Sequence, residues 1–553
     1  MIIKNGKTTS ALYKGTKEIV KRYKGTLLVY EAFKKLIASG VPPITLQKCK
    51  GANLVDYKIY GDSVQNGTPT PNTPIEIQSV GDKTKNLFEN KNDNISSSGV
   101  YKGLDMRNWE KGAYTLQLKL KDGKQIPQGV YFGFLYAETS AFWLIQNGGI
   151  NPLYKNLIVS ANVNNLNGVT CYPSNKTDAL IDAFDIFLVK GDYNINNVPL
   201  YEPYGYKIPV KVSGKNLFDG ELEIGYIDTE TGANNTYGYQ EYYRSKNYIE
   251  IDSSIKKIVF SSDANSKRIS LCCYDENYNY LGYYYKNLEI DGNRTFYVTN
   301  VLNNTKYVRF SVMTKNNPAI IENLPIQLEK GNILTVYEPY FEPITTNIYL
   351  NEPLRKIGDY ADYIDFESGK IVRNIAYKEI TSSSITAKSS SSTDDYNYYF
   401  ITFSKAKVGG GVPILSNIGG GTHNAFAQRN KEGIFTNSNT TFFIAFFDIK
   451  TLADAKQFVT DNYVYANYIL ETPTEQTIEL PNIPTIKGTT IIEVDTNILP
   501  SNMEIKYYGK TNILLLNEEE NIILNSIIND NTETELDITD TEINQILDEI
   551  IGG

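Results

Sequence analysis

The chain has 553 residues with 63 acidic and 54 basic side chains, which gives a formal net charge of −9. This balance argues against a nucleic-acid partner, because nucleic-acid binding depends on clustered Lys and Arg that release counterions from the phosphates. The length predicts roughly three to five domains, and the 43 tyrosines favour half-buried strands unless they reflect a composition bias of the genome.

Residues 1–40 are predicted to form a small β-meander that docks onto a partner. Tyr13-Lys-Gly-Thr16 recurs as Tyr23-Lys-Gly-Thr26, and apolar residues flank both Lys-Gly turns. The segment from Glu31 to Ala38 is expected to add a helical turn. A meander of this size has little core of its own, so the alternative is an unstructured leader before the first domain.

Residues 41–84 are predicted to be an extended connector with some strand content. Three prolines alternate with small residues between Gly67 and Pro74, which favours a stiff, extended backbone. Apolar and aromatic residues from Tyr57 to Tyr60 and from Ile75 to Val80 predict a strand on each side of it.

A repeat divides the middle of the chain. Lys85-Asn-Leu-Phe88 returns as Lys215-Asn-Leu-Phe218, and each copy opens a tract that closes on Lys-Gly and then Tyr-Glu-Pro-Tyr. The second closing sequence ends at Tyr340. Alternating apolar residues, as in Tyr114 to Leu120, predict antiparallel strands. We therefore predict two homologous β-sandwiches over 85–210 and 215–345.

The remaining chain is predicted in three parts. Residues 346–478 are expected to form a diverged third sandwich with one short helix between Asp448 and Asp461. Residues 479–510 are a proline-containing β connector with a strand from Thr490 to Asp495. Residues 511–553 are an acidic segment in which Thr539 and Glu542 form a capping box before an amphipathic helix. That helix packs either on its own chain or on sister chains.

The predicted fold class is therefore mainly β: tandem antiparallel jelly-roll-like β-sandwiches with a small N-terminal β-meander and a short C-terminal helical region. No segment approaches the about twenty apolar residues that a membrane-spanning helix needs, and the N-terminus lacks the pattern of a secretory signal. We expect a soluble protein without membrane insertion.

No residue spacing singles out a catalytic site, and none picks out a glycosidase-type carboxylate pair among the 63 acidic residues. The single histidine, His423, follows a glycine-rich loop, and the glycine runs at 409–411 and 419–421 lack the strand-helix context of a phosphate-binding loop. The four cysteines lack zinc-ligand spacing and are expected to be free thiols. We predict no enzyme, no catalytic residue, no metal ligand and no cofactor.

Aromatic residues are the candidate binding residues. Exposed rings stack on the apolar faces of sugars while neighbouring polar side chains bond the hydroxyls, although packing in a core or between subunits would also explain them. The candidate carbohydrate-binding residues are Trp109, Trp143, Tyr239, Tyr243, Tyr278, Tyr280 and Tyr284.

Several of these motifs resemble the minor structural proteins of tailed bacteriophages. The likeness is carried by the run from Tyr57 to Pro71, the Lys-Asn-Leu-Phe openings, the Tyr-Glu-Pro-Tyr closings and the run from Lys487 to Asp495, and it covers roughly residues 50–510. The Tyr-Lys-Gly-Thr repeat is similar to attachment segments of gut-phage fibre and baseplate proteins. The resemblance implies a virion appendage, usually trimeric, with jelly-roll domains like carbohydrate-binding modules.

The expected function is adhesion of a tail fibre, baseplate or head fibre to bacterial surface glycans. The expected partners are other virion proteins, bound through the N-terminal segment, the host glycans and sister copies in a homo-oligomer, with a trimer favoured; the expected location is the virion, assembled in the host cytoplasm. The alternatives are a purely structural capsid or collar decoration or assembly protein, and a polysaccharide depolymerase or esterase.

Overall fold

The computed structural model describes backbone and side chains for most of the chain between residues 57 and 505. The described ranges are 57–90, 102–110, 112–125, 127–136, 143, 145, 167–172, 178–193, 196–236, 242–251, 257–261, 268–287, 295–313, 325–331, 335, 337–389, 396–407, 412–421, 432–436, 442–486, 489–494 and 496–505. Beyond these ranges only the backbone of the strands and helix ends named below is described.

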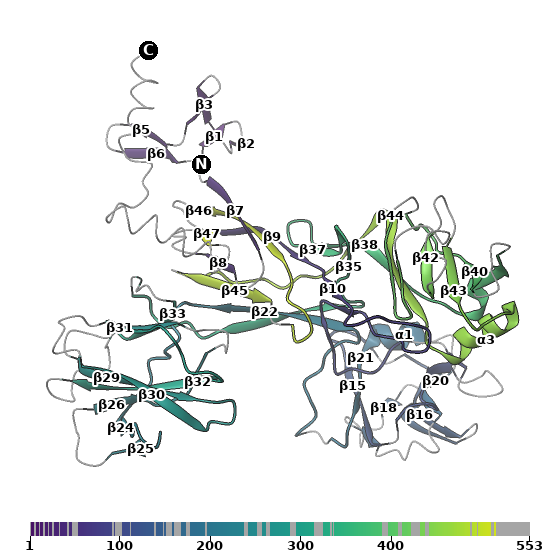
Figure 1. Cartoon of the computed structure of the whole chain (residues 1–553), viewed down its shortest axis with the longest axis horizontal. Helices are drawn as coiled ribbons and strands as arrows, with labels where there is room; N and C mark the ends of the chain where they lie inside the picture. The colour runs from purple at the N-terminus through teal and green to yellow at the C-terminus, as the bar shows by residue number, and fades with distance from the viewer. Residues whose placement is uncertain are drawn as a thin grey trace.

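The fold is mainly β, as predicted, with several antiparallel sheets and, among the described residues, two α-helices. At its centre lie two facing sheets, here called the central sandwich (Figure 1). One sheet has the order β41 (Ile414–Ser416), β44 (Tyr465–Thr477), β38 (Lys370–Glu379), β37 (Tyr363–Asp365), β9 (Asn53–Tyr60), β46 (Met503–Gly509) and β7 (Lys34–Gly40). The other has β12 (Asp82–Lys83), β22 (Tyr206–Ser213), β45 (Thr490–Val494), β8 (Ile44–Leu46) and β47 (Leu514–Leu515), with β34 (Ile344–Leu350) paired to β22.

The central sandwich is built from segments that are far apart in the sequence. Ile59 from β9 and Ile505 from β46 share one core with Val210 from β22, Ile348 from β34 and Ile492 from β45. The segments predicted as connectors, 41–84 and 479–510, therefore contribute strands to this core. Two short hairpins join it: β10 (Ser63–Val64) with β11 (Gln78–Ser79), and β35 (Lys356–Ile357) with β36 (Tyr360–Ala361).

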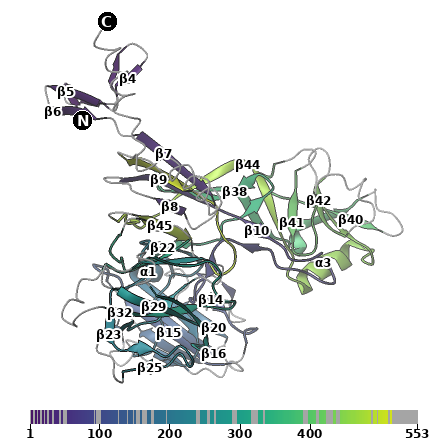
Figure 2. The ribbon, with the colours of Figure 1, turned by 60° about the vertical axis from the view of Figure 1, so that its left-hand side comes forward.

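Three further β units are inserted into the central sandwich, each with its own core. Unit one lies between β12 and β22, unit two between β22 and β34, and unit three between β38 and β44. Units one and two lie side by side below the central sandwich in Figure 1, and Figure 2 shows unit three projecting away from them.

Unit one has a six-stranded and a three-stranded sheet around a core that includes Leu116, Phe132 and Leu188. The six-stranded order is β13 (Asp93–Asn94), β14 (Lys102–Asp105), β20 (Gly168–Tyr172), β16 (Tyr131–Ala137), β17 (Ser140–Gln146) and β18 (Gly149–Ile150). The three-stranded order is β19 (Leu157–Val159), β15 (Tyr114–Leu120) and β21 (Phe184–Lys190), and helix α1 (Thr177–Ala183) precedes β21.

Unit two repeats this arrangement around Phe260, Leu271 and Phe310. Its larger sheet has β23 (Leu222–Ile224), β26 (Tyr242–Ser245), β32 (Tyr307–Thr314), β29 (Ser266–Tyr274) and β30 (Tyr280–Asn287), with β27 (Ile249–Glu250) also paired to β32. Its smaller sheet has β31 (Thr295–Val298), β28 (Ile258–Ser261) and β33 (Gln327–Lys330), and β24 (Tyr226–Ile227) pairs with β25 (Asn234–Asn235).

The strand order of the two units corresponds sheet by sheet. The larger sheet contains the order β14-β20-β16-β17 in unit one and β26-β32-β29-β30 in unit two. In the smaller sheet the last strand, β21 or β33, pairs with the middle strand, β15 or β28. The repeated sequence motifs therefore mark a repeated topology, with a separate core in each copy.

The closing Glu of each repeat ties its unit to neighbouring backbone. Glu202 accepts hydrogen bonds from the Lys85 N–H at 2.7 Å and from Lys207 Nζ at 2.5 Å. Glu338 lies 3.2 Å from Lys215 Nζ and accepts a 2.8 Å hydrogen bond from the N–H of Thr489 in the central sandwich. The repeated motifs thus hold each inserted unit where its chain enters and leaves.

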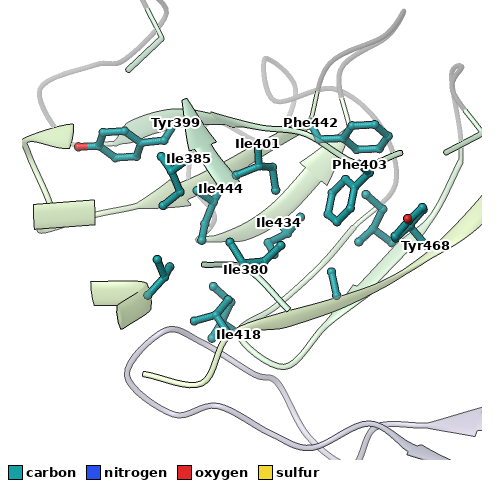
Figure 3. Close-up of a cluster of buried hydrophobic side chains, with 14 of the residues drawn as sticks. Ile380, Ile385, Tyr399, Ile401, Phe403, Ile418, Ile434, Phe442, Ile444 and Tyr468 are labelled. Carbon is teal, nitrogen blue, oxygen red and sulfur yellow. The ribbon is translucent and has the colours of Figure 1, made fainter. Parts of the chain in front are cut away.

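Unit three contains a four-stranded sheet and the predicted helix. The sheet order is β39 (Ile385–Lys388), β40 (Asn397–Ile401), β43 (Phe442–Phe446) and β42 (Gly433–Thr436), and η4 (Ser382–Ser384) is a short 3-10 helix. Helix α3 (Leu452–Asp461) starts where the Thr451 side chain accepts a hydrogen bond from the Asp454 N–H at 3.1 Å. Figure 3 shows the core, in which Ile401, Ile444 and Tyr468 converge.

The N-terminal strands form three successive hairpins. These pair β1 (Ile2–Lys4) with β2 (Lys7–Thr9), β3 (Leu12–Lys14) with β4 (Lys17–Ile19), and β5 (Lys21–Lys24) with β6 (Leu27–Glu31). The helical turn predicted from Glu31 to Ala38 is wrong: the segment continues into β7, which pairs with β46 over its whole length, so a distant partner decides its conformation. The predicted C-terminal amphipathic helix lies outside the described residues.

Candidate functional site

A cluster of tyrosines lies on the outer face of the larger sheet of unit two, at the turn that joins β29 to β30. The turn is built by Asp275, whose Oδ1 accepts hydrogen bonds of 2.8 Å from the backbone N–H groups of Asn277 and Asn279. This side chain replaces backbone partners that the turn leaves unsatisfied. The turn places Tyr278 at its tip.

Tyr278 has an unusual backbone conformation for its residue type. Its φ is +63°, in the left-handed region where glycine or asparagine is favoured. Its side chain is 52% exposed. A bulky residue in this region costs about 1–3 kcal/mol, and such strain is concentrated at functional sites.

The Tyr278 ring is held by two neighbours. It stacks on Tyr307 with ring centroids 4.6 Å apart and planes 18° apart, and it meets the edge of Tyr248 at 4.9 Å. A side-chain hydrogen bond with Tyr278 raises the pKa of the Tyr307 hydroxyl. Tyr248, Tyr278 and Tyr307 are here called the tyrosine platform.

The platform rests on buried groups. Tyr274 is buried, meets Tyr248 edge-on at 4.9 Å, and donates a 2.8 Å hydrogen bond to the carbonyl of Gly232. The guanidinium of Arg309 lies 5.2 Å from the Tyr248 ring centre. Arg309 itself is fixed by a 2.5 Å hydrogen bond to the carbonyl of Ser245. The platform is therefore ordered without a ligand.

Polar side chains surround the platform. Glu276 and Asn277 are exposed in the same turn, and Glu250 pairs with Lys306 at 2.7 Å beside Tyr307. Exposed rings bordered by amides and charges provide an apolar surface together with hydrogen-bonding groups, which is the combination that a sugar requires.

The other predicted residues of unit two do not join this surface. Tyr280 lies on the same face, but its hydroxyl donates to the carbonyl of Thr229. Tyr284 lies on the inner face, packs against the core and donates to the carbonyl of Asn300. Tyr243 is 4% exposed, and Tyr239 lies outside the described residues.

The two tryptophans of unit one lie in different places. Trp109 packs against the core, with its ring 5.6 Å from that of Tyr114. Trp143 is half-buried and meets Tyr131 edge-on at 5.6 Å, on the face opposite Phe132. Tyr131 in turn lies 6.0 Å from Tyr172. Trp143 therefore belongs to a smaller aromatic cluster on the outer face of unit one.

The platform residues Tyr248 and Tyr307 were not identified from the sequence. Tyr307 alternates with the core residues Val308 and Phe310, so a two-residue period could place it on the outer face. That Tyr274 lies opposite Tyr307 is known only from the pairing of β29 with β32. No local pattern gives that register.

A second candidate site is a groove of about 770 Å³ at the lateral opening of the central sandwich. It lies between β34 on one sheet and β38 and β44 on the other, and residues 478–481, which follow β44, also line it. The lining residues are Asn347, Tyr349, Leu350, Asn351, Glu352, Ile371, Arg373, Ile375, Ala376, Tyr377, Leu470, Thr474, Gln476, Ile478, Glu479, Leu480 and Pro481.

A buried charge network supports the wall of this groove. Asp362 is fully buried and accepts hydrogen bonds from the N–H groups of Asn374 at 2.8 Å and Ile375 at 2.9 Å, and from Arg373 at 3.1 Å. Arg355 binds Glu352 at 2.6 Å. The bonds to Asp362 fix the backbone of β38, and the bond from Arg355 fixes the Glu352 side chain.

The described residues show no grouping of metal-ligating side chains, and none of the described helices has the length and apolar character to cross a membrane. His423 lies outside the described residues. Cys171, Cys272 and Cys273 are buried free thiols, as predicted. Burial raises the pKa of Cys272 to about 12 and that of Cys273 to about 11, so neither thiol is poised as a nucleophile.

Comparison with known proteins identified no relative: the chain matches no protein-family model, no curated protein and no solved structure.

Proposed function

We propose that the chain is a non-catalytic bacteriophage virion appendage protein that adheres to glycans of the bacterial surface through the tyrosine platform of unit two. The phage assignment rests on the resemblance of the sequence motifs to those of minor structural proteins of tailed phages. The adhesive role rests on the geometry of the platform.

The observation that carries the adhesive role is the conformation of Tyr278. A turn tip that needs φ near +63° normally takes glycine or asparagine, yet here it carries a large aromatic ring that is half exposed. Stacking on Tyr307 offsets part of the strain. Backbone strain of this kind is typical of functional sites, and a ring that is already ordered loses less entropy when it binds a ligand.

Each platform offers a small contact, so a single site binds weakly. In a homo-oligomer several platforms face the cell surface together, and the first contact raises the effective concentration of the next. A trimer of weak sites then adheres firmly. The N-terminal segment is proposed to attach the oligomer to other virion proteins.

The experiment measures binding of the full-length protein to intact host cells and to their purified surface glycans. The variant combines Tyr278→Asn, which keeps a residue suited to positive φ, with Tyr248→Ala. The control is Tyr297→Ala, which removes an exposed tyrosine from β31, outside the platform. We expect binding to fall at least about tenfold in the platform variant and to stay unchanged in the control.

The competing function is purely structural, with the units packing against other virion proteins. Its support is that three candidate aromatics are not available to a ligand: the hydroxyls of Tyr280 and Tyr284 bond backbone carbonyls of unit two, and Tyr243 is buried. This alternative predicts that the wild-type protein binds virion components and no host glycan, and that the platform variant behaves like the wild type.

A further inference from the structure

The groove in the central sandwich is a lateral opening between two sheets. Among the described strands β34 pairs with β22 alone, so its other edge faces the opening. On the opposite sheet, β41 pairs with β44 at residues 466–468 and the segment 405–407 pairs with it at 469–471, while β44 is exposed from Glu471 onward. The groove is therefore bounded by the free edge of β34 and by the exposed part of β44.

The lining combines two kinds of surface. Leu470, Ile478 and Leu480, all half-buried, contribute an apolar strip, while Asn347, Asn351 and Gln476 contribute side-chain amides. Tyr349, which is 38% exposed, adds an aromatic face at the rim. A ligand that matches this lining has flat apolar faces and edges that both donate and accept hydrogen bonds. Pyranose rings have these properties.

The charges of the groove select against anions. Among the described residues that line it there is no lysine, and Arg373 is the one arginine. Its guanidinium is committed to the carbonyls of Pro353 at 2.5 Å and Glu352 at 2.8 Å as well as to Asp362. Glu352 and Glu479 also line the groove, and because Glu352 is paired with Arg355 at 2.6 Å, Glu479 leaves the lining with a net negative charge. A phosphate- or carboxylate-bearing polymer would therefore meet repulsion without a free cation.

The groove is rigid before any ligand arrives. Arg355 holds Glu352 and also lies 5.4 Å from the centre of the Tyr377 ring, and Asp362 fixes the backbone of the β38 wall. Pre-formed walls reduce the entropy that binding costs. The volume of about 770 Å³ falls within the range of about 300–1,000 Å³ that is typical of small-molecule sites.

We propose that this groove is a second binding site, separate from the tyrosine platform, and that it takes a short neutral oligosaccharide. The amides bind the hydroxyls, and the apolar strip and Tyr349 contact the ring faces. The proposal does not depend on the platform, because the two sites share no residue.

The test uses the full-length protein and isothermal titration with neutral trisaccharides of glucose, of galactose and of N-acetylglucosamine, and with a glycerol-phosphate oligomer as the anionic probe. The groove variant combines Tyr349→Ala with Gln476→Ala, two exposed positions whose truncation leaves the core intact. Tyr297→Ala again serves as the matched control, and unfolding midpoints verify that all variants are folded.

The expected result is that at least one neutral trisaccharide binds, that its affinity falls at least about tenfold in the groove variant, and that it is unchanged in Tyr297→Ala and in the platform variant. The proposal is overturned if no neutral trisaccharide binds, if the groove variant binds as the wild type does, or if the anionic oligomer binds more tightly. Cell adhesion that depends on the platform is measured separately, so failure of either proposal is recognised independently of the other.

Discussion

Asn86 and Asn216 make the same hydrogen bonds in different units. Asn86 donates to the carbonyl of Ile186 at 2.8 Å and accepts from the N–H groups of Leu188 and Phe88 at 3.1 and 3.0 Å. The side chain thus joins the opening motif of unit one to its final strand, β21. Unit one is closed by this contact.

The second asparagine repeats the pattern. Asn216 donates to the carbonyl of Ile326 at 3.1 Å and accepts from the N–H groups of Leu328 and Phe218, both at 3.1 Å. Both side chains are buried, with 4% and 3% exposure. The Lys-Asn-Leu-Phe motif is therefore explained by closure of each unit.

Replacing either asparagine with alanine should destabilise its unit. Asn86→Ala leaves the buried N–H of Leu188 and the partly buried N–H of Phe88 without this acceptor, and an unsatisfied buried group costs about 1–3 kcal/mol. Hydrogen exchange followed by mass spectrometry should show faster exchange in unit one and unchanged exchange in unit two. Asn216→Ala should show the reverse, and equal effects of both variants on both units would contradict the assignment.

The contact of Glu202 should make the anchoring of unit one sensitive to acid. Burial by itself raises the pKa of this carboxyl, but the hydrogen bonds from Lys207 and the Lys85 N–H outweigh it and hold the pKa below its usual 4.5. A carboxyl with a lower pKa in the folded state stabilises the fold fully above the usual value and loses this contribution as the pH falls through the folded value.

Denaturant midpoints from about pH 7 to about pH 3 test this linkage. The wild type should lose stability more steeply than Glu202→Gln below about pH 4.5, because the amide cannot titrate. The exposed Glu471→Gln should follow the wild-type curve. Parallel curves for wild type and Glu202→Gln would show that this contact contributes nothing.

Asp362 should be one of the most sensitive positions in the central sandwich. Asp362→Ala removes the acceptor of the Asn374 and Ile375 N–H groups and leaves the guanidinium of Arg373 without its buried carboxylate. Breaking a buried pair in this way costs about 3–5 kcal/mol. The matched surface change Glu475→Gln, which removes an exposed pair with Lys370, should cost about 0–1 kcal/mol. Chemical unfolding of the two variants measures the difference.

Gly205 lies where the chain returns from unit one to the central sandwich. Its φ is +126°, and a Cβ there would lie 2.2 Å from the carbonyl oxygen of Leu350. Gly331 has φ +110° with nothing within 4 Å. Alanine at either position incurs backbone strain of about 1–3 kcal/mol, and only Gly205→Ala adds a clash. We expect its thermal midpoint to fall further than that of Gly331→Ala, and equal midpoints would refute the contact.

Much of the local structure follows from the sequence. The alternation from Tyr114 to Leu120 predicts β15 because a strand places successive side chains on opposite faces. The helical spacing after Thr451 predicts α3, and the two Lys-Asn-Leu-Phe openings predict two units with one topology. Period, turn residues and repetition are local properties, so the residues themselves determine them.

The tertiary structure decided which distant segments pair. From the sequence, the strand at Tyr57 to Tyr60 is assigned to a connector; in the structure it pairs with β46 and β37. The segment before Gly40 is predicted as a helical turn, and its pairing with β46 makes it a strand. Tyr248, Tyr278 and Tyr307 meet for the same reason, because the register of β29, β30 and β32 brings them to one end of a sheet. Strand pairing joins residues of any separation, and a local pattern specifies the face of a strand but not its partner.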